Sequence, residues 1–437
     1  MNPIPVIAIF DVGKTNKKLF LFDEDYHIVF ERSARFAEIN DEDGFPCEDI
    51  ELLKNWLLDL MNEISQMPQF HIKAVNFSAY GASLVFLDGQ ANCIPPLYNY
   101  LKPYPEKLGE QFYATYGDKE KFSLQTASPA LGCLNSGLQL YRIKYEKPEL
   151  FSKIKYALHL PQYLSYLLTG QKFSDLTSIG CHTTLWDFNR NDYHKWVFDE
   201  GVANKLAPIQ SAGTLIQTPN YKAGIGLHDS SAALIPYLMS FKEPFVLIST
   251  GTWSITLNPF NQSPLTIDEL KNDCLNYLQY NGKTVKASRF FIGPAYEDGL
   301  KQLSARFNAD IAKYANLDYS RELEKQLTGQ QFDQENLSEK TLSQLAYYEL
   351  IADLVERQKF STDLVLAGTK VSHLFVDGGF SQNQVFMNML TRAYPNLKVY
   401  SAFIPQSTAL GAALAVHEYW NDAPVPLQLI QLKYYPV

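Results

Sequence analysis

Residues 7–22 form an apolar run, a turn and a second apolar run, and this pattern limits the possible folds more than any other part of the chain. The run Ile7–Phe10 ends at Asp11, Gly13 lies in the turn, and the second run begins at Leu19. Because glycine lacks a Cβ, a ligand can approach the backbone closely there. Free amides in such a turn suit a phosphate. The stretch predicts a hairpin with a phosphate-sized turn, although an ordinary hairpin containing an aspartate gives the same pattern.

The same pattern returns about half a chain later, at residues 245–257. An apolar run ends at Thr250, and Gly251 lies between hydroxyl-bearing residues before the next apolar run. Two copies of one strand–turn–strand unit predict two similar domains that face each other. We place the boundary near residue 240, so that the domains are 1–240 and 241–437.

The composition of the 437 residues, with 46% hydrophobic and 19% charged, is typical of a globular protein. A net charge of −9 argues against nucleic acid or an anionic membrane as the main partner. The five cysteines form no C-x-x-C pair, which favours reduced thiols over a disulfide framework or a zinc site. We also find no signal-peptide pattern and no apolar stretch of membrane-spanning length, so we expect a cytoplasmic protein.

Two polar segments follow in the predicted N-terminal domain. His228 and Asp229 come after a short apolar stretch and precede small residues that can begin a helix. Asp229 is either a second acid at a strand end, with a chemical role, or the N-cap of that helix. The loop at 172–187 is rich in Ser, Thr, His and Asp. It either approaches a polar ligand or is a solvated connection.

A double glycine, Gly378 and Gly379, follows the apolar strand at 373–376. A helix N-terminus after paired glycines can receive a phosphate, and bare backbone there leaves room for an adenine ring. The small-residue helix at 407–415 allows close approach of helix and sheet. Pure packing explains this second segment as well as nucleotide contact does.

Taken together, these segments resemble the FGGY carbohydrate kinases, which belong to one superfamily with actin and the heat-shock chaperone ATPases. Five motifs carry the resemblance, in the family's order: Asp11-x-Gly13-x-Thr15-x-Lys17, Gly226–Asp229, Thr250–Ser254, Gly378-Gly379 with Asn383, and Gly411–Ala413. The Thr250–Ser254 motif is most similar to that of the L-rhamnulose and L-fuculose kinases. The motifs cover essentially the whole chain.

The resemblance implies an α/β fold of two ribonuclease-H-like domains, as in actin-like ATPases, each with a five-stranded mixed sheet, around a central cleft. It implies ATP and Mg²⁺ as cofactors and a small sugar as substrate. By motif position, Asp229 is expected to be the catalytic base and Asp11 to hold Mg²⁺. The expected nucleotide contacts are Gly13, Thr15, Asn16, Lys17, Gly251, Thr252, Gly378, Gly379 and Asn383. The expected sugar contacts are Tyr80, Ala82, Ser83, Asn99, Asp175 and Asp229.

One segment departs from the family pattern, because Tyr100 and Lys102 stand where relatives usually have a D-x-R pair. We expect L-fuculose or L-rhamnulose as substrate, phosphorylated at O1, with xylulose, ribulose and glycerol as alternatives. An ATP-driven conformational protein and a catalytically weak sugar sensor are the rival classes. The presence of both Asp11 and Asp229 favours the kinase. A homodimer is compatible with the sequence.

Overall fold

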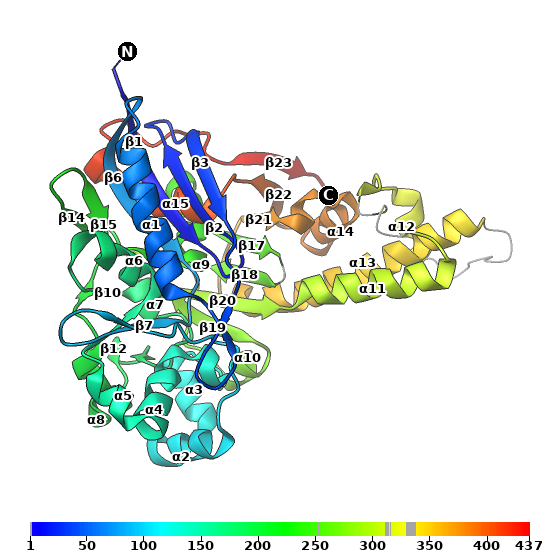
Figure 1. The fold of residues 1–437 in the computed structure, drawn as a ribbon. Coiled ribbons are helices and arrows are strands. Elements are labelled where there is room, and N and C mark those ends of the chain that lie inside the picture. Colours follow the sequence, from blue (N-terminus) through cyan, green and yellow to red (C-terminus); the bar gives the residue numbers. More distant parts are fainter. Residues whose placement is uncertain (1, 252, 311–313, 315, 329–337) are drawn as a thin grey trace.

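The computed structural model describes residues 2–251, 253–310, 314, 316–328 and 338–437 (Figure 1). Two seven-stranded mixed sheets form its centre. The first sheet has the order β14 (Leu215–Gln217), β15 (Lys222–Gly224), β6 (Phe70–Ala79), β1 (Ile4–Val12), β2 (Lys17–Phe22) and β3 (Ile28–Ala34), with β16 (Leu227–His228) beside β6. The second has the order β19 (Cys274–Leu278), β20 (Thr284–Phe290), β18 (Ser254–Asn258), β17 (Phe245–Thr250), β21 (His373–Gly378), β22 (Lys398–Phe403) and β23 (Gln431–Tyr435).

Both sheets are built on one pairing pattern. Strand β1 pairs antiparallel with β2 and parallel with β6, and β17 pairs antiparallel with β18 and parallel with β21. The two predicted hairpins therefore occupy equivalent places, which confirms the prediction of two similar units. The prediction of five strands per sheet was wrong. Short strands such as β14 and β16, and the edge strands β19 and β23, extend both sheets, and their sequences are too short to show a clear alternation.

Two helices, α9 (Asp229–Ser240) and α15 (Ser407–Leu414), pack against each other between the sheets. Their contact is close: a Cβ on Gly411 would lie 1.8 Å from the carbonyl oxygen of Ala232. One apolar core runs through this layer and includes Ile9 from the first sheet and Leu247 from the second. Gly411 therefore serves packing, as one of the two interpretations predicted.

Other helices cover the outer faces of the sheets. Helices α1 (Ile50–Ser65) and α6 (Leu160–Thr169) pack on the first sheet, and α11 (Ile292–Phe307), α13 (Glu339–Leu366) and α14 (Gln384–Ala393) pack beside the second. Helices α11 and α13 project as a long arm (Figure 1). No helix in the described part of the chain is both long and apolar enough to cross a membrane.

A further lobe lies below the first sheet in Figure 1. It contains α2 (Glu106–Tyr116), α3 (Lys119–Thr126), α4 (Ser136–Glu146), α5 (Pro148–Lys153), α8 (Lys195–Asp199) and the sheet of β8 (Cys93–Ile94), β7 (Leu84–Leu87) and β9 (Tyr156–His159). The shorter helices are α7 (Leu176–Ile179), α10 (Ile267–Lys271), α12 (Arg321–Thr328) and α16 (His417–Trp420). The shorter strands are β4 (Ile39–Asn40), β5 (Pro46–Cys47), β10 (Ser174–Asp175), β11 (Trp186–Asp187), β12 (Asp192–Tyr193) and β13 (Ile209–Gln210).

Candidate active site

The two hairpin turns have compact backbones with exposed positions. In the first turn the Gly13 N–H donates to the carbonyl oxygen of Asn16 at 2.9 Å, and Thr15 is exposed. The Asn16 side chain accepts a hydrogen bond from Arg35 at 2.7 Å. In the second turn the Gly251 N–H donates to the carbonyl oxygen of residue 253 at 2.9 Å. Thr252, an expected nucleotide contact, lies outside the described residues.

Asp11 lies at the end of β1, and its carboxyl group is largely enclosed by protein. The Thr408 hydroxyl, from the first turn of α15, donates to Asp11 Oδ2 at 2.8 Å. Burial raises the pKa of Asp11 to about 6, and the nearby charge of Asp229 adds to that rise, against the opposing effects of the Thr408 bond and Lys18. When ionised, this carboxyl group therefore has little compensating charge, and a bound cation would supply it.

The surroundings of Asp11 suit a hydrated Mg²⁺ ion. Among the described residues no group of three or more His, Cys, Asp or Glu side chains is arranged to hold a metal directly. Mg²⁺ usually keeps several waters and binds through one or two carboxylates. Asp11 therefore fits the expected role of a single anchoring carboxylate.

Lys17 does not lie where a phosphate contact requires it. Its ammonium is 2% exposed, donates to the Lys14 carbonyl oxygen at 2.9 Å, and pairs with Glu48 at 3.0 Å. Successive side chains of a strand point to opposite faces, and Lys17 shares its face with the buried Leu19 and Leu21. The Lys17 ammonium is therefore already engaged with Glu48 and the Lys14 carbonyl oxygen.

Asp229 is the first residue of α9, with His228 as the N-cap. The Ser230 N–H donates to Asp229 Oδ1 at 2.6 Å, and His228 Nδ1 lies 3.5 Å from the same oxygen. The Asp229 carboxylate remains about one-third exposed. Gly81 makes room for the His228 ring, because a Cβ there would lie 2.4 Å from His228 Nε2. Asp229 is thus held near the helix start but is not the capping residue.

A cavity of about 250 Å³ lies beside Asp229 and has walls from both halves of the chain. The lining residues are Tyr80, Gly81, Ala82, Tyr100, Leu134, Cys181, His182, His228, Asp229, Ser230, Trp253, Ile255, Tyr277 and Arg289. Most of the wall is aromatic or apolar, with a few polar groups, as in many small-molecule sites. The cavity has the position and polarity expected of a site for a small polar substrate next to a general base.

The described residues 6–228 match the sequence model of the N-terminal domain of the FGGY family of carbohydrate kinases. The chain belongs to the FGGY family. The family assignment confirms the resemblance, and it places the Asp11 turn within the matched region and Asp229 directly after it.

Curated relatives of this FGGY chain are named rhamnulokinase. The protein of Mannheimia succiniciproducens is 26% identical over 263 residues, which are 57% of this chain. In that comparison the chain spans only about half of the relative, namely 52%. The protein of Yersinia pestis is 22% identical over 441 residues, covering 92% of this chain and 88% of the relative.

Solved structures show that the two-domain, actin-like fold of FGGY kinases extends over the whole chain. A carbohydrate kinase from Novosphingobium aromaticivorans superposes with a TM-score of 0.77 at 22% identity, covering 98% of this chain and 96% of that one. A ligand-bound xylulose kinase from Lactobacillus acidophilus superposes with a TM-score of 0.79 at 15% identity, covering 99% of this chain and 94% of that one. These comparisons confirm the predicted fold class.

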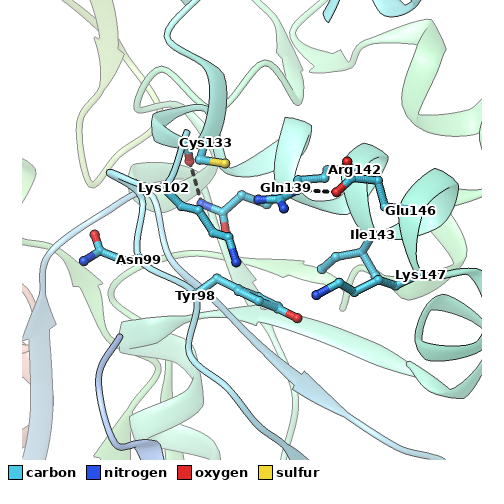
Figure 2. Close-up of a pocket in the computed structure, with 9 residues that line it drawn as sticks. All are labelled: Tyr98, Asn99, Lys102, Cys133, Gln139, Arg142, Ile143, Glu146 and Lys147. Atoms are coloured by element: carbon cyan, nitrogen blue, oxygen red, sulfur yellow. Dashed lines mark hydrogen bonds and ion pairs between the residues drawn. The ribbon is translucent and has the colours of Figure 1, made fainter. Parts of the chain in front are cut away.

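Tyr100 and Lys102, the pair that departs from the FGGY pattern, lie in two different environments. Tyr100 lines the cavity beside Asp229, with its ring 6.1 Å from that of Tyr80. Lys102 instead forms a buried ion pair with Asp41 and contacts Asp43 at 2.6 Å. Figure 2 shows Lys102 beside Tyr98 and near Gln139 in a separate cavity of only about 20 Å³. That space is too small for a sugar, so Lys102 has a structural role.

The expected sugar contacts are only partly brought together. Tyr80 and Ala82 line the cavity, whereas Ser83 is buried behind it. Asn99 is buried and donates to the Pro46 carbonyl oxygen at 3.1 Å. Asp175 is 1% exposed and caps α7 by accepting the N–H of residue 177 at 2.9 Å, while burial raises its pKa to about 7. Ser83, Asn99 and Asp175 therefore do not line the cavity.

The double glycine at the end of β21 has two different surroundings. Gly378 has a φ of +82°, and a Cβ there would lie 1.8 Å from the Thr250 carbonyl oxygen. A Cβ on Gly379 would meet nothing within 4 Å. Asn383 caps α14 by accepting the Phe386 N–H at 3.0 Å, and its amide donates to Tyr347 at 2.7 Å. The open backbone at Gly379 suits a flat ring, whereas the Asn383 side chain is already engaged.

A cavity of about 800 Å³ borders the same turn. Gly378 and Asp377 line it, together with Gln406 and Thr408 at the start of α15. Thr408, which lines this open space, also donates to Asp11 in the first hairpin. The cavity is large enough for the body of a nucleotide.

His182, Trp253, Tyr277 and Arg289 line the Asp229 cavity but were not among the expected sugar contacts. His182 lies within the polar loop 172–187, and Trp253 lies within the Thr250–Ser254 motif, so the sequence pointed to both regions. Tyr277 and Arg289 come from β19 and β20, and their strand patterns gave no signal that they face a cleft.

Proposed function

We propose that the chain is an ATP-dependent kinase that transfers the γ-phosphate of ATP to a hydroxyl group of a ketose. The observation that carries the proposal is the placement of Asp229. Its partly exposed carboxylate lies at a cavity with walls from both halves, and it is close enough to Asp11 for its charge to raise the Asp11 pKa. A phosphate acceptor and a metal-bound phosphate would meet between these two acids.

In the proposed reaction Asp229 accepts the proton of the sugar hydroxyl while that oxygen forms a bond to the γ-phosphorus. The bond from phosphorus to the bridging oxygen breaks, and ADP leaves. A carboxylate suits this role because it needs only to be ionised within hydrogen-bond reach of the hydroxyl. Kinases of this kind work mainly by positioning and charge stabilisation.

The nucleotide is proposed to lie between the two hairpin turns. Gly13, Thr15, Asn16 and Gly251 would line its phosphates, and the open backbone at Gly379 would accept the adenine ring. Mg²⁺ held through water by Asp11 would neutralise charge on the transferred phosphate. The contact between Thr408 and Asp11 orients the carboxylate that this role requires.

For the substrate we propose a 6-deoxyketohexose, L-rhamnulose or L-fuculose, phosphorylated at O1. The rhamnulokinase names of the curated relatives support this choice. The tyrosine rings of Tyr80 and Tyr100 also offer an apolar surface for a methyl group. Xylulose is the second candidate, because a xylulose kinase is among the proteins that share the fold.

A coupled assay of ADP release tests the proposal with a panel of ketoses, aldoses, polyols and sugar acids. We expect sugar-dependent ADP release, fastest with a deoxyketohexose. A clear preference for xylulose or glycerol would reject the substrate and leave the kinase intact. ATP hydrolysis that no member of the panel stimulates would reject the kinase and favour the actin-like alternative.

A further inference from the structure

The cavity beside Asp229 contains polar atoms that the protein leaves without partners. Arg289 Nε and His182 Nδ1 are both buried and form no hydrogen bond, and both residues line the cavity. Buried polar groups in native proteins are nearly always paired, because an unpaired one costs free energy. His228 Nδ1 is a third such atom in the wall of this cavity, but it lies 3.5 Å from Asp229 Oδ1. The atoms of Arg289 and His182 therefore indicate places for oxygen atoms of a ligand.

We propose that Arg289 and His182 are substrate-binding residues that hold oxygen atoms of a neutral sugar while Asp229 meets the hydroxyl to be phosphorylated. This inference rests on the proposed function and adds the residues that determine specificity. Arg289 comes from β20 in the second half, whereas His182 and Asp229 come from the first half. The sugar would thus be held from both sides of the cleft.

The guanidinium of Arg289 is fixed by contacts that do not use its buried Nε. Its Nη2 donates to Asp273 Oδ1 at 2.7 Å, and its Cζ lies over the Trp253 ring, 5.5 Å from the ring centroid. The Arg289 side chain is only 9% exposed. Because an arginine N–H can only donate, Nε requires an acceptor oxygen. Prior fixation by Asp273 and Trp253 lowers the entropy cost of that contact.

His182 contributes a neutral polar group to the same wall. Its ring lies 6.2 Å from the Tyr277 ring, and its backbone carbonyl accepts a hydrogen bond from Asn135 at 2.7 Å. Burial, and then the charge of Arg289, lowers the pKa of His182 to about 3. The imidazole is therefore uncharged at neutral pH and adds no second positive charge.

The charges around the cavity favour a neutral sugar over a sugar acid. Arg289 already has an anionic partner in Asp273, and Asp229 adds a second carboxylate to the site. A substrate carboxylate would bring a third negative charge against one guanidinium. Hydroxyl and carbonyl oxygens accept the Arg289 hydrogen bond without that repulsion.

The test compares steady-state constants of the full-length wild type with those of Arg289→Gln, Arg289→Lys and Asp273→Asn. We expect Arg289→Gln to raise KM for the best sugar by about 10–100-fold, the range for loss of a hydrogen bond to a charged group. KM for ATP should stay close to that of the wild type. Arg289→Lys should be intermediate, because an ammonium retains charge without the planar fork. Asp273→Asn, which loosens the fixation of Arg289 but keeps its guanidinium, should raise KM for the sugar less than Arg289→Gln does.

Singly deoxygenated analogues of the best sugar then identify the oxygen that Arg289 holds. If one sugar oxygen accepts the hydrogen bond of Arg289, the analogue that lacks this oxygen should show the same KM with the wild type and with Arg289→Gln. With every other deoxy analogue, Arg289→Gln should raise KM by the full factor seen with the best sugar. His182→Asn provides a second test, since asparagine tolerates the positive φ of 43° at this position. This variant carries an amide in place of the ring and should raise KM for the sugar without changing KM for ATP.

The outcomes separate this inference from the proposed function. Sugar turnover with an unchanged KM in Arg289→Gln and His182→Asn would overturn the inference alone. A best substrate that is a sugar acid would overturn the inference and the proposed ketose substrate, but not the kinase activity. Calorimetric binding of a neutral sugar that weakens in Arg289→Gln, without any turnover, would support the inference and reject the kinase. Absence of any sugar binding would overturn both. If Arg289→Gln does not fold, the KM values of Arg289→Lys and His182→Asn for the sugar test the inference in its place.

Discussion

Thr408 donates its hydroxyl hydrogen to Asp11 Oδ2 at 2.8 Å, although the two residues are 397 positions apart in the sequence. Thr408 is in the first turn of α15, and Asp11 is the last residue but one of β1. The contact ties the last packed helix of the second half to the first hairpin of the chain. It also opposes the effect of burial on the Asp11 carboxyl group.

Asp11→Asn should lose activity yet stabilise the free protein at neutral pH. The pKa of Asp11 is about 6 in the folded state, whereas the ordinary value for aspartate is 3.8. Between these two pH values the folded state therefore binds more protons than the unfolded state. Stability contributed by the protonated group is lost as pH rises through 6. We expect the free energy of unfolding at pH 7.5 to be higher in Asp11→Asn by on the order of 2 kcal/mol.

Urea unfolding of both proteins at pH 7.5 and pH 4.5 measures this difference, which should shrink at the lower pH. In the wild type, kcat/KM should fall below about pH 6 as Asp11 becomes protonated. A less stable Asp11→Asn protein at pH 7.5 would contradict the account of this carboxyl group.

Gly378 and Gly379 offer a matched pair of substitutions. Gly379→Leu places a side chain in open space, so Tm should stay near that of the wild type while ATP binds more weakly. Gly378→Ala forces a positive φ and a Cβ against the Thr250 carbonyl oxygen, so Tm should fall. Thermal melts and ATP calorimetry separate the two effects. Unchanged ATP affinity in Gly379→Leu would remove Gly379 from the nucleotide site.

Lys17 is predicted to contribute to stability rather than to phosphate binding. Lys17→Met removes the nearer cation of the buried Glu48 and leaves Lys14 at 3.5 Å, so the free energy of unfolding should fall by at most about 3–5 kcal/mol. The double variant with Glu48→Gln should recover most of that loss. In the folded double variant the Kd for ATP should match that of the wild type. A stable Lys17→Met protein with much weaker ATP binding would return Lys17 to the phosphate site.

The sequence supported prediction where the pattern was long or repeated. The hairpins at Asp11 and Gly251, and the packed helix with Gly411, appeared as expected because apolar runs and small residues mark them directly. Lys17 was expected at the phosphates from its motif position, whereas strand alternation puts it on the face of Leu19, where it pairs with Glu48.

Other site residues depend on tertiary contacts that a linear pattern does not contain. Arg289 and Tyr277 reach the cavity only because β19 and β20 extend the second sheet toward the cleft. Asn383 and Asp175 are common capping residues, and both cap helices here. Distinguishing a cap from a ligand contact required the position of the following helix.

Asp175 should affect folding without affecting the sugar. Asp175→Ala removes the cap of α7 and should cost about 1 kcal/mol, whereas Asp175→Asn should cap nearly as well. KM for the sugar should be unchanged in both variants, because Asp175 does not line the Asp229 cavity. Urea unfolding and steady-state kinetics check the two statements. A well-folded Asp175→Asn enzyme with a strongly raised KM for the sugar would place Asp175 in the substrate site.

The central claim is that Asp229 takes the proton of the sugar hydroxyl, and single-turnover kinetics of Asp229→Asn test it most directly. Asparagine keeps the size of the side chain and an oxygen for the Ser230 N–H, but it cannot accept the proton. With Asp175→Asn as the matched control, we predict that phosphoryl transfer to the best sugar falls by about 10²–10⁴-fold, while the Kd for ATP is unchanged. Transfer at nearly the wild-type rate in Asp229→Asn would contradict the account.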